Sequence, residues 1–420
     1  MNGKNNISIC FMSTQKLVSL SVAPNKETYE FILKLYKLFG LQVKNNKLKC
    51  PIFRYSEKQK QDFEFFFNHY ISNCPQLWTV KTFLEECSIN EYIFVCSDIS
   101  KIPQKREIKI RKILARLNGV SIKMPFPMKC LDNYNYYSFY ADNEIKVGER
   151  IRQKRRCRFC GKSMPEVSFK HKAHAFSEFL NNKKIILNEE CDTCNEKFGN
   201  GIEQDFGNWI LPSRIFFNVC GKTGTPTMSN SEVRMYRDDK DLDKKLKISI
   251  KRPVNHLQDL LTIPVCKGLS ITPQNIYKTL CKYALSVINA ELFCGNFTET
   301  INWITKDEFW GTLPVVKIRT KKYKLCEYPE LIVFVKRAKS KQQLPKLWAF
   351  LTFGNLSMVY IAPSSKEEND FFAVRAHQDF FFDKVWSTVK KWESHDLSVC
   401  NKRKTEMTWR FKPNKNTSFR

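Results

Sequence analysis

Several features are scarce in this sequence of 420 residues, and each scarcity excludes a class of protein. Only 14 glycines and 17 prolines occur, while 42% of the residues are hydrophobic, which excludes a collagen-like repeat and global disorder. Long apolar runs are missing: the strongest is Leu331–Val335, whereas a membrane-spanning helix needs about 20 apolar residues. Nothing after Met1 resembles a secretory signal. We therefore expect a soluble protein of the cytoplasm.

Acidic residues are also scarce relative to basic ones. The chain has 42 aspartates and glutamates against 70 lysines and arginines, which gives a formal net charge of +28. Such an excess favours a polyanionic partner. A solvated basic surface without a partner is the alternative interpretation of the same charge.

Cysteine, by contrast, is plentiful, with 16 residues. A disulfide-stapled scaffold would be short and dense in cysteine. Here most cysteines stand alone in apolar or mixed stretches, as Cys10, Cys74, Cys96 and Cys281 do. Isolated thiols of this kind behave as small buried hydrophobes, which is typical of a reducing compartment.

The length predicts two or three domains, since domains are commonly about 150 residues long. We expect an α+β multidomain protein in which a central unit is flanked by two mixed α/β regions. The predicted divisions are an N-terminal α/β domain over 1–145, a central domain over 146–220, a C-terminal α+β domain over 221–400 and a basic tail over 401–420.

Periodicity and end signals predict the main elements of the flanking regions. Helical spacing of apolar residues, or a proline at a helix start, predicts helices over 27–39, 59–71 and 101–117 and from Pro273 towards Gly295. Runs of β-branched and aromatic residues predict strands over 92–96, 331–335, 347–353 and 356–362. The last two strands should form a hairpin at Gly354-Asn355.

Two closely spaced cysteine pairs lie at the centre of the chain. The first is Cys157-Arg-Phe-Cys160, followed by Gly161, and the second, thirty residues later, is Cys191-Asp-Thr-Cys194. Each pair can bring two thiolates around a tight turn to one tetrahedral zinc, at about 2.3 Å from the metal. Four protein ligands leave no open position, so this spacing predicts a structural zinc that does no chemistry.

The segment between the cysteine pairs is longer than a plain zinc ribbon needs. It contains Lys172–Phe176, a polar loop over 181–184 and the apolar run Ile185–Asn188. Two short strands around a loop fit this span. The second cysteine pair would then open a helix with Asn195 in its first turn and Gly199 near its end, which makes a ββα arrangement.

These residues resemble the zinc-stapled HNH endonucleases with the ββα-metal fold. The resemblance covers about residues 150–215, including the run 201–209, and implies a treble-clef-like unit over the central domain. In that family the histidine of the first strand is the general base, which is His174 here. An asparagine before the second cysteine pair orients the histidine, and Asn188 matches it best. The residue just past the last cysteine ligates a catalytic divalent metal, so Asn195 makes this an H-N-N variant.

The chemistry explains why such residues are needed. A neutral imidazole can take a proton from water near pH 7, which phosphodiester hydrolysis requires. A divalent cation stabilises the charge that develops on the phosphate and the leaving oxygen. Oxygen ligands suit Mg²⁺ or Mn²⁺.

One position departs from the family pattern. The residue before the catalytic histidine is often an acid or a histidine that supplies another metal ligand, but here it is Ala173. Either another group holds the metal, or catalysis is weak or absent. The nearby candidates are His171, Glu178, Glu203 and Asp205, of which we prefer Glu203 because it closely follows the predicted helix. A solvated carboxylate is the alternative for Glu203, and His171 could contact phosphate.

A basic run leads into the first cysteine pair and contains no acidic residue. It would place a nucleic-acid backbone beside His174, because phosphate contacts position the substrate. The residues concerned are Arg150, Arg152, Lys154, Arg155, Arg156, Arg158 and Lys162, with His171 as a further phosphate contact.

The first hypothesis is a metal-dependent endonuclease acting on double-stranded DNA, in which the flanking regions control targeting or activation. By analogy, it would be a prokaryotic antiviral defence effector, with a homo-oligomeric state or a regulatory protein partner as further possibilities. The second is a non-catalytic zinc-containing protein that binds DNA or RNA. The third is an RNA-processing or RNA-binding protein, since basic, aromatic-rich flanks also suit single strands.

Overall fold

The computed structural model describes most of the chain and divides it into two compact units, Met1–Leu131 and Asp132–Arg420. The described residues are 7–14, 16–23, 25–40, 42–44, 47–49, 52–96, 104–120, 124–142, 144–237, 245–251, 262–265, 269–289, 293, 295–306, 308–340, 342–404 and 407–410. Among the helices of these residues, none has the length and apolar character needed to cross a membrane.

The first unit is a four-stranded sheet with helices packed through phenylalanine side chains. The sheet has the order β2-β1-β6-β5, and the helices α1 and α2 each begin with a reciprocal capping box, at Asn25 and Ser56 respectively. Its elements are β1 (Ile7–Met12), β2 (Leu17–Val22), α1 (Lys26–Leu38), β3 (Gln42–Lys44), β4 (Lys47–Lys49), β5 (Ile52–Arg54), α2 (Glu57–Tyr70), α3 (Leu77–Glu85), β6 (Tyr92–Cys96) and α4 (Gln104–Leu117).

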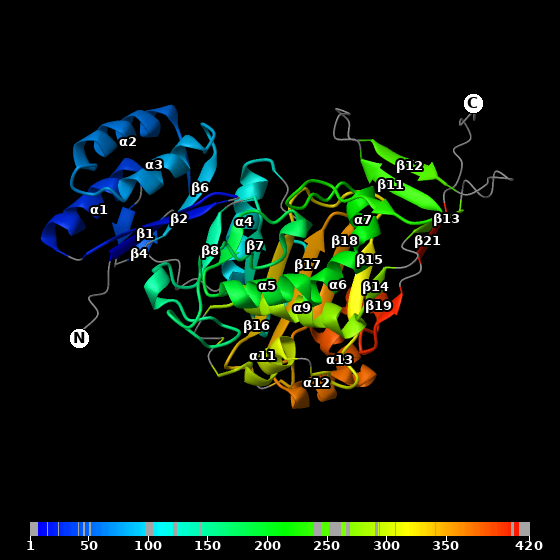
Figure 1. Ribbon diagram of the computed structural model, residues 1–420. Helices are drawn as coiled ribbons and strands as arrows, with labels where there is room; N and C mark the ends of the chain where they lie inside the picture. The colour runs from blue at the N-terminus through cyan, green and yellow to red at the C-terminus, as the bar shows by residue number, and fades with distance from the viewer. Residues whose placement is uncertain are drawn as a thin grey trace, which may run out of the picture. The chain divides into compact units, whose positions relative to one another are not determined.

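The second unit is built on a six-stranded antiparallel sheet of the order β19-β15-β18-β17-β16-β7 (Figure 1). Its strands are β7 (Tyr134–Tyr140), β8 (Ile145–Val147), β9 (Ile185–Leu187), β10 (Met228–Ser229), β11 (Val233–Arg237), β12 (Leu246–Ile250), β13 (Thr262–Val265), β14 (Ser270–Ile271), β15 (Val316–Thr320), β16 (Glu330–Lys336), β17 (Leu347–Phe353), β18 (Leu356–Ile361), β19 (Glu393–His395), β20 (Arg403–Lys404) and β21 (Met407–Arg410). Its helices are α5 (Asp192–Asn200), α6 (Ile202–Trp209), α7 (Leu211–Phe216), α9 (Pro273–Val287), α11 (Thr298–Thr305), α12 (Lys366–Ala373) and α13 (Arg375–Val385).

The central strands β16, β17 and β18 of the large sheet are largely buried on both faces, and successive residues of each strand point to opposite sides. On one face Leu331 and Leu351 join a core cluster with residues of α9. On the other, Trp348 stacks on Phe334 with ring centroids 3.8 Å apart and meets Phe381 of α13 edge-on. These three strands are therefore nearly continuous apolar runs rather than alternating ones.

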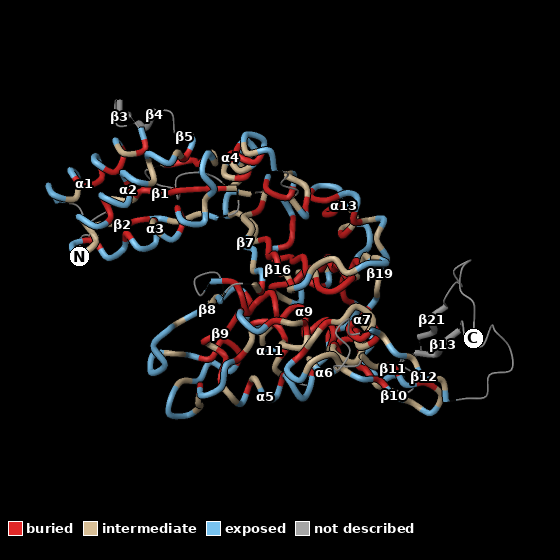
Figure 2. The backbone as a smooth tube through the Cα atoms, turned by 90° about the horizontal axis from the view of Figure 1, so that it is seen from above, coloured by how far each residue is buried: buried red, intermediate tan, exposed pale blue. Residues whose placement is uncertain are grey.

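Helix α9 is the most deeply buried helix of the second unit, and Figure 2 shows its backbone in red. Every residue of α9 except Asn275 is buried. Pro273 starts the helix as expected, but α9 ends at Val287 and does not continue to Gly295. The reason is a tertiary contact, because the Arg158 guanidinium donates to the carbonyls of Leu285 and Ile288 at the helix end.

The predicted elements of the flanking regions are confirmed. Helices α1, α2 and α4 and strands β6, β16, β17 and β18 coincide with the predicted ranges to within three residues. Gly354 turns the β17–β18 hairpin at φ +51°, and a Cβ atom there would lie 2.7 Å from Val219 Cγ2. Glycine at this turn therefore serves both the backbone conformation and the close approach of Val219.

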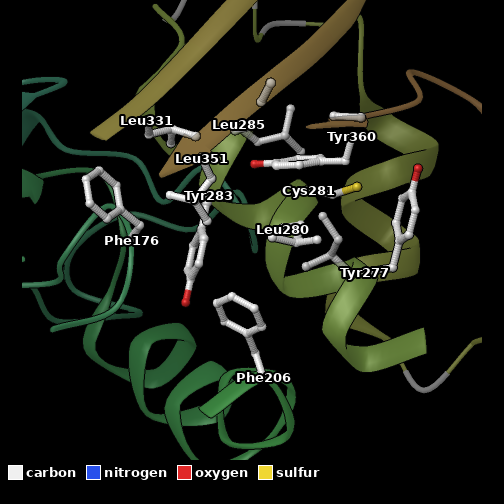
Figure 3. Close-up of a cluster of buried hydrophobic side chains, with 14 of the residues drawn as sticks. Phe176, Phe206, Tyr277, Leu280, Cys281, Tyr283, Leu285, Leu331, Leu351 and Tyr360 are labelled. Carbon is white, nitrogen blue, oxygen red and sulfur yellow. The ribbon is translucent and has the colours of Figure 1, made fainter. Parts of the chain in front are cut away.

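The central segment shares one hydrophobic core with the large sheet. Figure 3 shows Tyr283 of α9 between Phe176 and Phe206, with its hydroxyl turned away from Leu351. Phe206 lies edge-on to Tyr283, with ring centroids 5.9 Å apart. The predicted boundaries at 145, 220 and 400 stay predictions. Strands β20 and β21 fall within the predicted basic tail, of which residues 411–420 lie outside the described residues.

The mixed α/β architecture with several sheets is confirmed, whereas the treble-clef detail of the central unit stays a prediction. Strand β9 is only three residues long, and it pairs in parallel with β8, which the sequence analysis did not predict. On its other side it meets the 173–175 segment through a single antiparallel bridge between His174 and Ile186. A helix follows at α5, as expected.

We predict that Arg158→Met lowers the free energy of unfolding by about 3–5 kcal/mol, the range for breaking a buried ion pair. The Arg158 side chain is 3% exposed and its Nε lies 2.8 Å from Glu189 Oε2. The substitution would leave Glu189 and the end of α9 without their partner. Urea unfolding measures the change, and Arg152→Met is the control because Arg152 is exposed. Equal stability of the two variants would contradict the structural role of Arg158.

Candidate functional site

The four cysteines of the two pairs form a compact cluster, in which the Sγ atoms all lie within 4.8 Å of one another. The first pair sits on a turn that Gly161 closes at φ +72°, where its N–H donates to the Cys157 carbonyl at 2.9 Å. In the second pair, Cys191 is the N-cap of α5 and Cys194 lies in its first turn. Among the described residues this is the one group of potential ligands that is close enough for a metal ion.

The donor set of this cluster fits zinc. Three of the thiols are buried and Cys160 is exposed. Burial is the main cause that raises the pKa of Cys191 to about 12. Thiolates in such surroundings need a cation to offset them, and zinc binds four thiolates in a tetrahedron. The cluster could therefore hold the predicted structural zinc.

Beside the cluster lies a cleft of about 590 Å³. It is formed by the segment 171–177, the 3-10 turn Glu178–Leu180 that follows it, the helices α5 and α6, and a turn after α7. The residues that line it are His171, Lys172, His174, Ser177, Glu178, Phe179, Asn195, Gly199, Glu203 and Lys222.

His174 lies in this cleft with 20% of its side chain exposed. Its position is held by the backbone on both sides, because Leu187 N–H donates to the Ala173 carbonyl at 2.8 Å and Ala175 N–H to the Ile185 carbonyl at 3.0 Å. Burial is the main cause that lowers the pKa of His174 below 6.5, and the Glu178 carboxylate opposes it. The imidazole is therefore neutral at pH 7 and able to accept a proton.

Of the two asparagines of the H-N-N pattern, only Asn195 belongs to the cleft lining. Asn195 lines the cleft from the first turn of α5. Asn188 is buried directly after β9, where its N–H donates to the Val147 carbonyl at 2.9 Å. Its Nδ2 has no hydrogen-bond partner among the described residues. The orienting role of Asn188 stays a prediction.

Glu203 lines the cleft but is not a solvated carboxylate. Its side chain is 12% exposed, and its Oε1 lies 2.9 Å from Lys282 Nζ. Its Oε2 accepts a hydrogen bond from the Ser177 hydroxyl. Lys282 is itself 1% exposed and also lies 3.0 Å from Glu190 Oε2. Both oxygens of Glu203 are thus occupied by protein groups.

Of the other predicted candidates for the catalytic metal, His171 and Glu178 line the cleft and Asp205 does not. Asp205 accepts from the Asn275 amide at 2.8 Å and is not part of the cleft lining. Ala173 is buried and offers no ligand atom. Since the cysteine cluster is the one close group of ligands in the described part of the chain, no second cage of three His, Cys or acidic ligands is preformed at His174.

The basic run is not part of the cleft lining, and its contact with nucleic acid stays a prediction. None of its seven residues belongs to the cleft lining described above, whereas Arg156 and Arg158 line a second hollow beside the first cysteine pair. Arg158 is buried against Glu189 and the end of α9. Its guanidinium is therefore occupied by protein groups, and Arg158 is not among the proposed nucleic-acid contacts. The remaining members are exposed, apart from the half-buried Arg155.

Besides His174, three basic residues line the cleft: His171, Lys172 and Lys222. Asp192 holds the backbone at His171 in place, since its carboxylate accepts from the N–H groups of Lys170 and His171 at 2.9 Å each. Lys222 stands on the turn between Gly221 and Gly224, whose backbones bridge each other.

The sequence also gave no indication that Lys282, Ser177 and Tyr283 belong to the surroundings of the cleft. Lys282 reaches Glu203 across 79 residues of sequence, and Tyr283 reaches Ser177 across 106, with their hydroxyl oxygens 2.5 Å apart. Both come from α9, which the sequence shows only as an apolar helix. No local pattern could have indicated these contacts, because they depend on how α9 packs against α6.

Comparison with known families agrees with this geometry. Residues 157–211 match a family model described as HNH endonuclease, so the predicted resemblance is confirmed for this segment. The matched segment contains the four cysteines, His174, Asn188, Asn195 and Glu203, and it is a limited part of the 420-residue chain. It supports a nuclease whose substrate is nucleic acid. Comparisons with curated proteins and with solved structures found no significant match.

We predict that the purified protein contains about one zinc per chain, because the four thiols form one tetrahedral site. Cys194→Ser should lose the zinc and unfold the central segment, since a structural zinc contributes about 10–16 kcal/mol to folding in small zinc domains. Elemental analysis and circular dichroism measure the two effects. The control is Cys400→Ser, which changes an exposed free cysteine. Protein that is folded and free of zinc would contradict the prediction.

Proposed function

We propose that the protein is a metal-dependent endonuclease that hydrolyses phosphodiester bonds in double-stranded DNA. The observation that carries the proposal is the neutral His174 imidazole in a cleft beside the cysteine cluster, within the segment that matches the HNH endonuclease family. A histidine in this state can take the proton from an attacking water.

The other cleft residues support the same reaction. The side chains of His171, Lys172 and Lys222 can contact the phosphates of the substrate and position it. A divalent cation, Mg²⁺ or Mn²⁺, would stabilise the negative charge that develops on the phosphate. Asn195 is the residue of the cleft best suited to such an ion, and Glu203 would join it only by giving up Lys282 or Ser177.

The biological setting is part of the proposal. A basic, cysteine-containing nuclease with large flanking regions fits a cytoplasmic antiviral defence effector, whose activity a regulatory protein partner or self-association would control. The free cysteines that stand alone in the chain favour a reducing compartment.

A second candidate is a non-catalytic zinc-containing protein that binds DNA or RNA. Two observations favour it. Ala173 replaces a metal ligand of the family, and the carboxylate of Glu203 is occupied by Lys282 and Ser177.

Plasmid cleavage separates the two candidates. Wild-type protein with Mg²⁺ or Mn²⁺ should nick or cut DNA, and His174→Ala should lower the rate by about 10²–10⁴-fold, the range for loss of a general base. A chelator should abolish the activity, and His69→Ala is the control because His69 is exposed in the first unit. Cleavage that survives His174→Ala would rule out the proposed mechanism. DNA or RNA binding without cleavage of either would favour the second candidate.

The pH dependence tests the protonation state of His174. Because burial lowers its pKa below 6.5, the neutral form predominates at pH 6.5 and above. The rate should therefore be high at neutral pH and fall as the pH drops through a midpoint below 6.5. A profile of kcat/KM against pH, measured at constant ionic strength with Mg²⁺, checks this. A midpoint above 6.5 would show that another group is the base.

A further inference from the structure

We propose that Glu178 is the positioning residue of His174: its carboxylate accepts the Nδ1–H of the imidazole and leaves Nε2 to act as the base. This inference rests on the proposed function for its catalytic meaning. The pairing of Glu178 with His174, and the imidazole tautomer that follows from it, can be tested without measuring DNA cleavage.

The geometry points to this pair. His174 Nδ1 lies 3.9 Å from Glu178 Oε2, and both residues line the cleft. They are four residues apart, and the Glu178 side chain is 28% exposed. The two atoms are close enough for electrostatic interaction, and a small rotation of either side chain would complete a hydrogen bond. A carboxylate on one ring nitrogen fixes the proton there and presents the other nitrogen as the acceptor.

Neither of the alternatives has a comparable contact with the imidazole. Glu203 has Lys282 on one oxygen and the Ser177 hydroxyl on the other. Asn188 follows β9, and the hydrogen bond found for it in the described structure runs from its backbone to Val147. Of the two glutamates that line the cleft, Glu178 is therefore the one that pairs with His174.

The segment that carries Glu178 is held firmly. Ser177, the residue before it, is buried and lies 2.5 Å from the Tyr283 hydroxyl of α9. Asn182, which is fully buried, donates to the Phe176 carbonyl at 2.6 Å and accepts from the Ile185 N–H at 2.9 Å. These bonds tie both ends of the 3-10 turn to the rest of the cleft, so Glu178 is preorganised next to His174.

The charges around His174 divide into two groups. Glu178 and Glu203 favour its protonated form, while Lys282 and Lys172 oppose it, and burial has the largest effect. His171 and Lys222 are the other basic groups of the cleft. Removing the Glu178 charge should therefore lower the pKa of His174 further.

The test compares Glu178→Ala and Glu178→Gln with Glu196→Ala, a change at an exposed glutamate of α5 outside the cleft lining. The first readout is the ¹⁵N chemical shifts of the His174 ring in the full-length protein, assigned with His174→Ala. Wild type should show the Nδ1–H tautomer. Glu178→Ala should shift the ring towards Nε2–H and lower its pKa, whereas Glu178→Gln should keep the tautomer in part, because its amide oxygen still accepts.

The second readout is plasmid cleavage at saturating DNA. Glu178→Ala should lower kcat by about a hundredfold, the effect of misplacing a reacting group by about 1 Å, with little change in KM. Zinc content and thermal unfolding should match those of the control.

The outcomes distinguish the two proposals. An unchanged tautomer and pKa of His174 in Glu178→Ala would overturn the pairing, whatever the rate. A changed tautomer in a protein whose wild type cuts no nucleic acid would support the pairing and overturn the nuclease function. A changed tautomer with an unaltered cleavage rate would overturn the positioning role.

Discussion

The rest of the site depends on the ion pairs that the buried ammonium group of Lys282 makes with two carboxylates. The ammonium lies 3.0 Å from Glu190, the residue before Cys191 of the cysteine cluster, and 2.9 Å from Glu203 on the wall of the cleft. Its Nζ also lies 5.5 Å from the centroid of the Phe198 ring on α5. One side chain of α9 thus joins the cysteine cluster, the cleft and the core beneath the large sheet. Breaking a buried charge group of this kind by removing one partner is strongly destabilising.

The electrostatics of this group follow from its burial. Burial raises the pKa of Glu190 to about 7 against the lowering effect of Lys282. For Lys282 itself, burial acts to lower the pKa, but the two carboxylates more than offset it, so the ammonium stays charged. A charged lysine with two acidic neighbours cannot be moved without exposing unpaired charge. It therefore specifies how α9 docks on the nuclease-like segment.

The same contact accounts for part of the difference between the cleft and the HNH pattern that its segment resembles. A metal ligand is missing at Ala173, and the carboxylate that sequence reasoning preferred as a substitute is held by Lys282 and Ser177. The chemistry left to the cleft residues themselves is a neutral imidazole, a nearby carboxylate at Glu178 and basic groups suited to phosphate. Any divalent ion would be coordinated by Asn195, water and the substrate. Mg²⁺ commonly binds in this way, with few protein ligands and several waters.

The sequence by itself determined the local parts of this protein. The spacing of Cys157, Cys160, Cys191 and Cys194 predicted their cluster, because two tight turns suffice to bring four thiols together. The period of the apolar residues predicted helices such as α1 and α2, and the strand runs around Gly354-Asn355 predicted the β17–β18 hairpin, since those signals act within a few residues. His174 could be singled out because it stands between the cysteine pairs.

Only the tertiary structure decided which side chains meet. It turned Arg158 from a surface cation into the cap of α9, and it set Lys282 and Tyr283 against residues 79 and 106 positions away. It also placed Lys222 in the lining of the cleft, next to His171 and Lys172. The physical reason is that burial and pairing of charge depend on packing between distant helices and strands, and neither periodicity nor motif spacing contains that information.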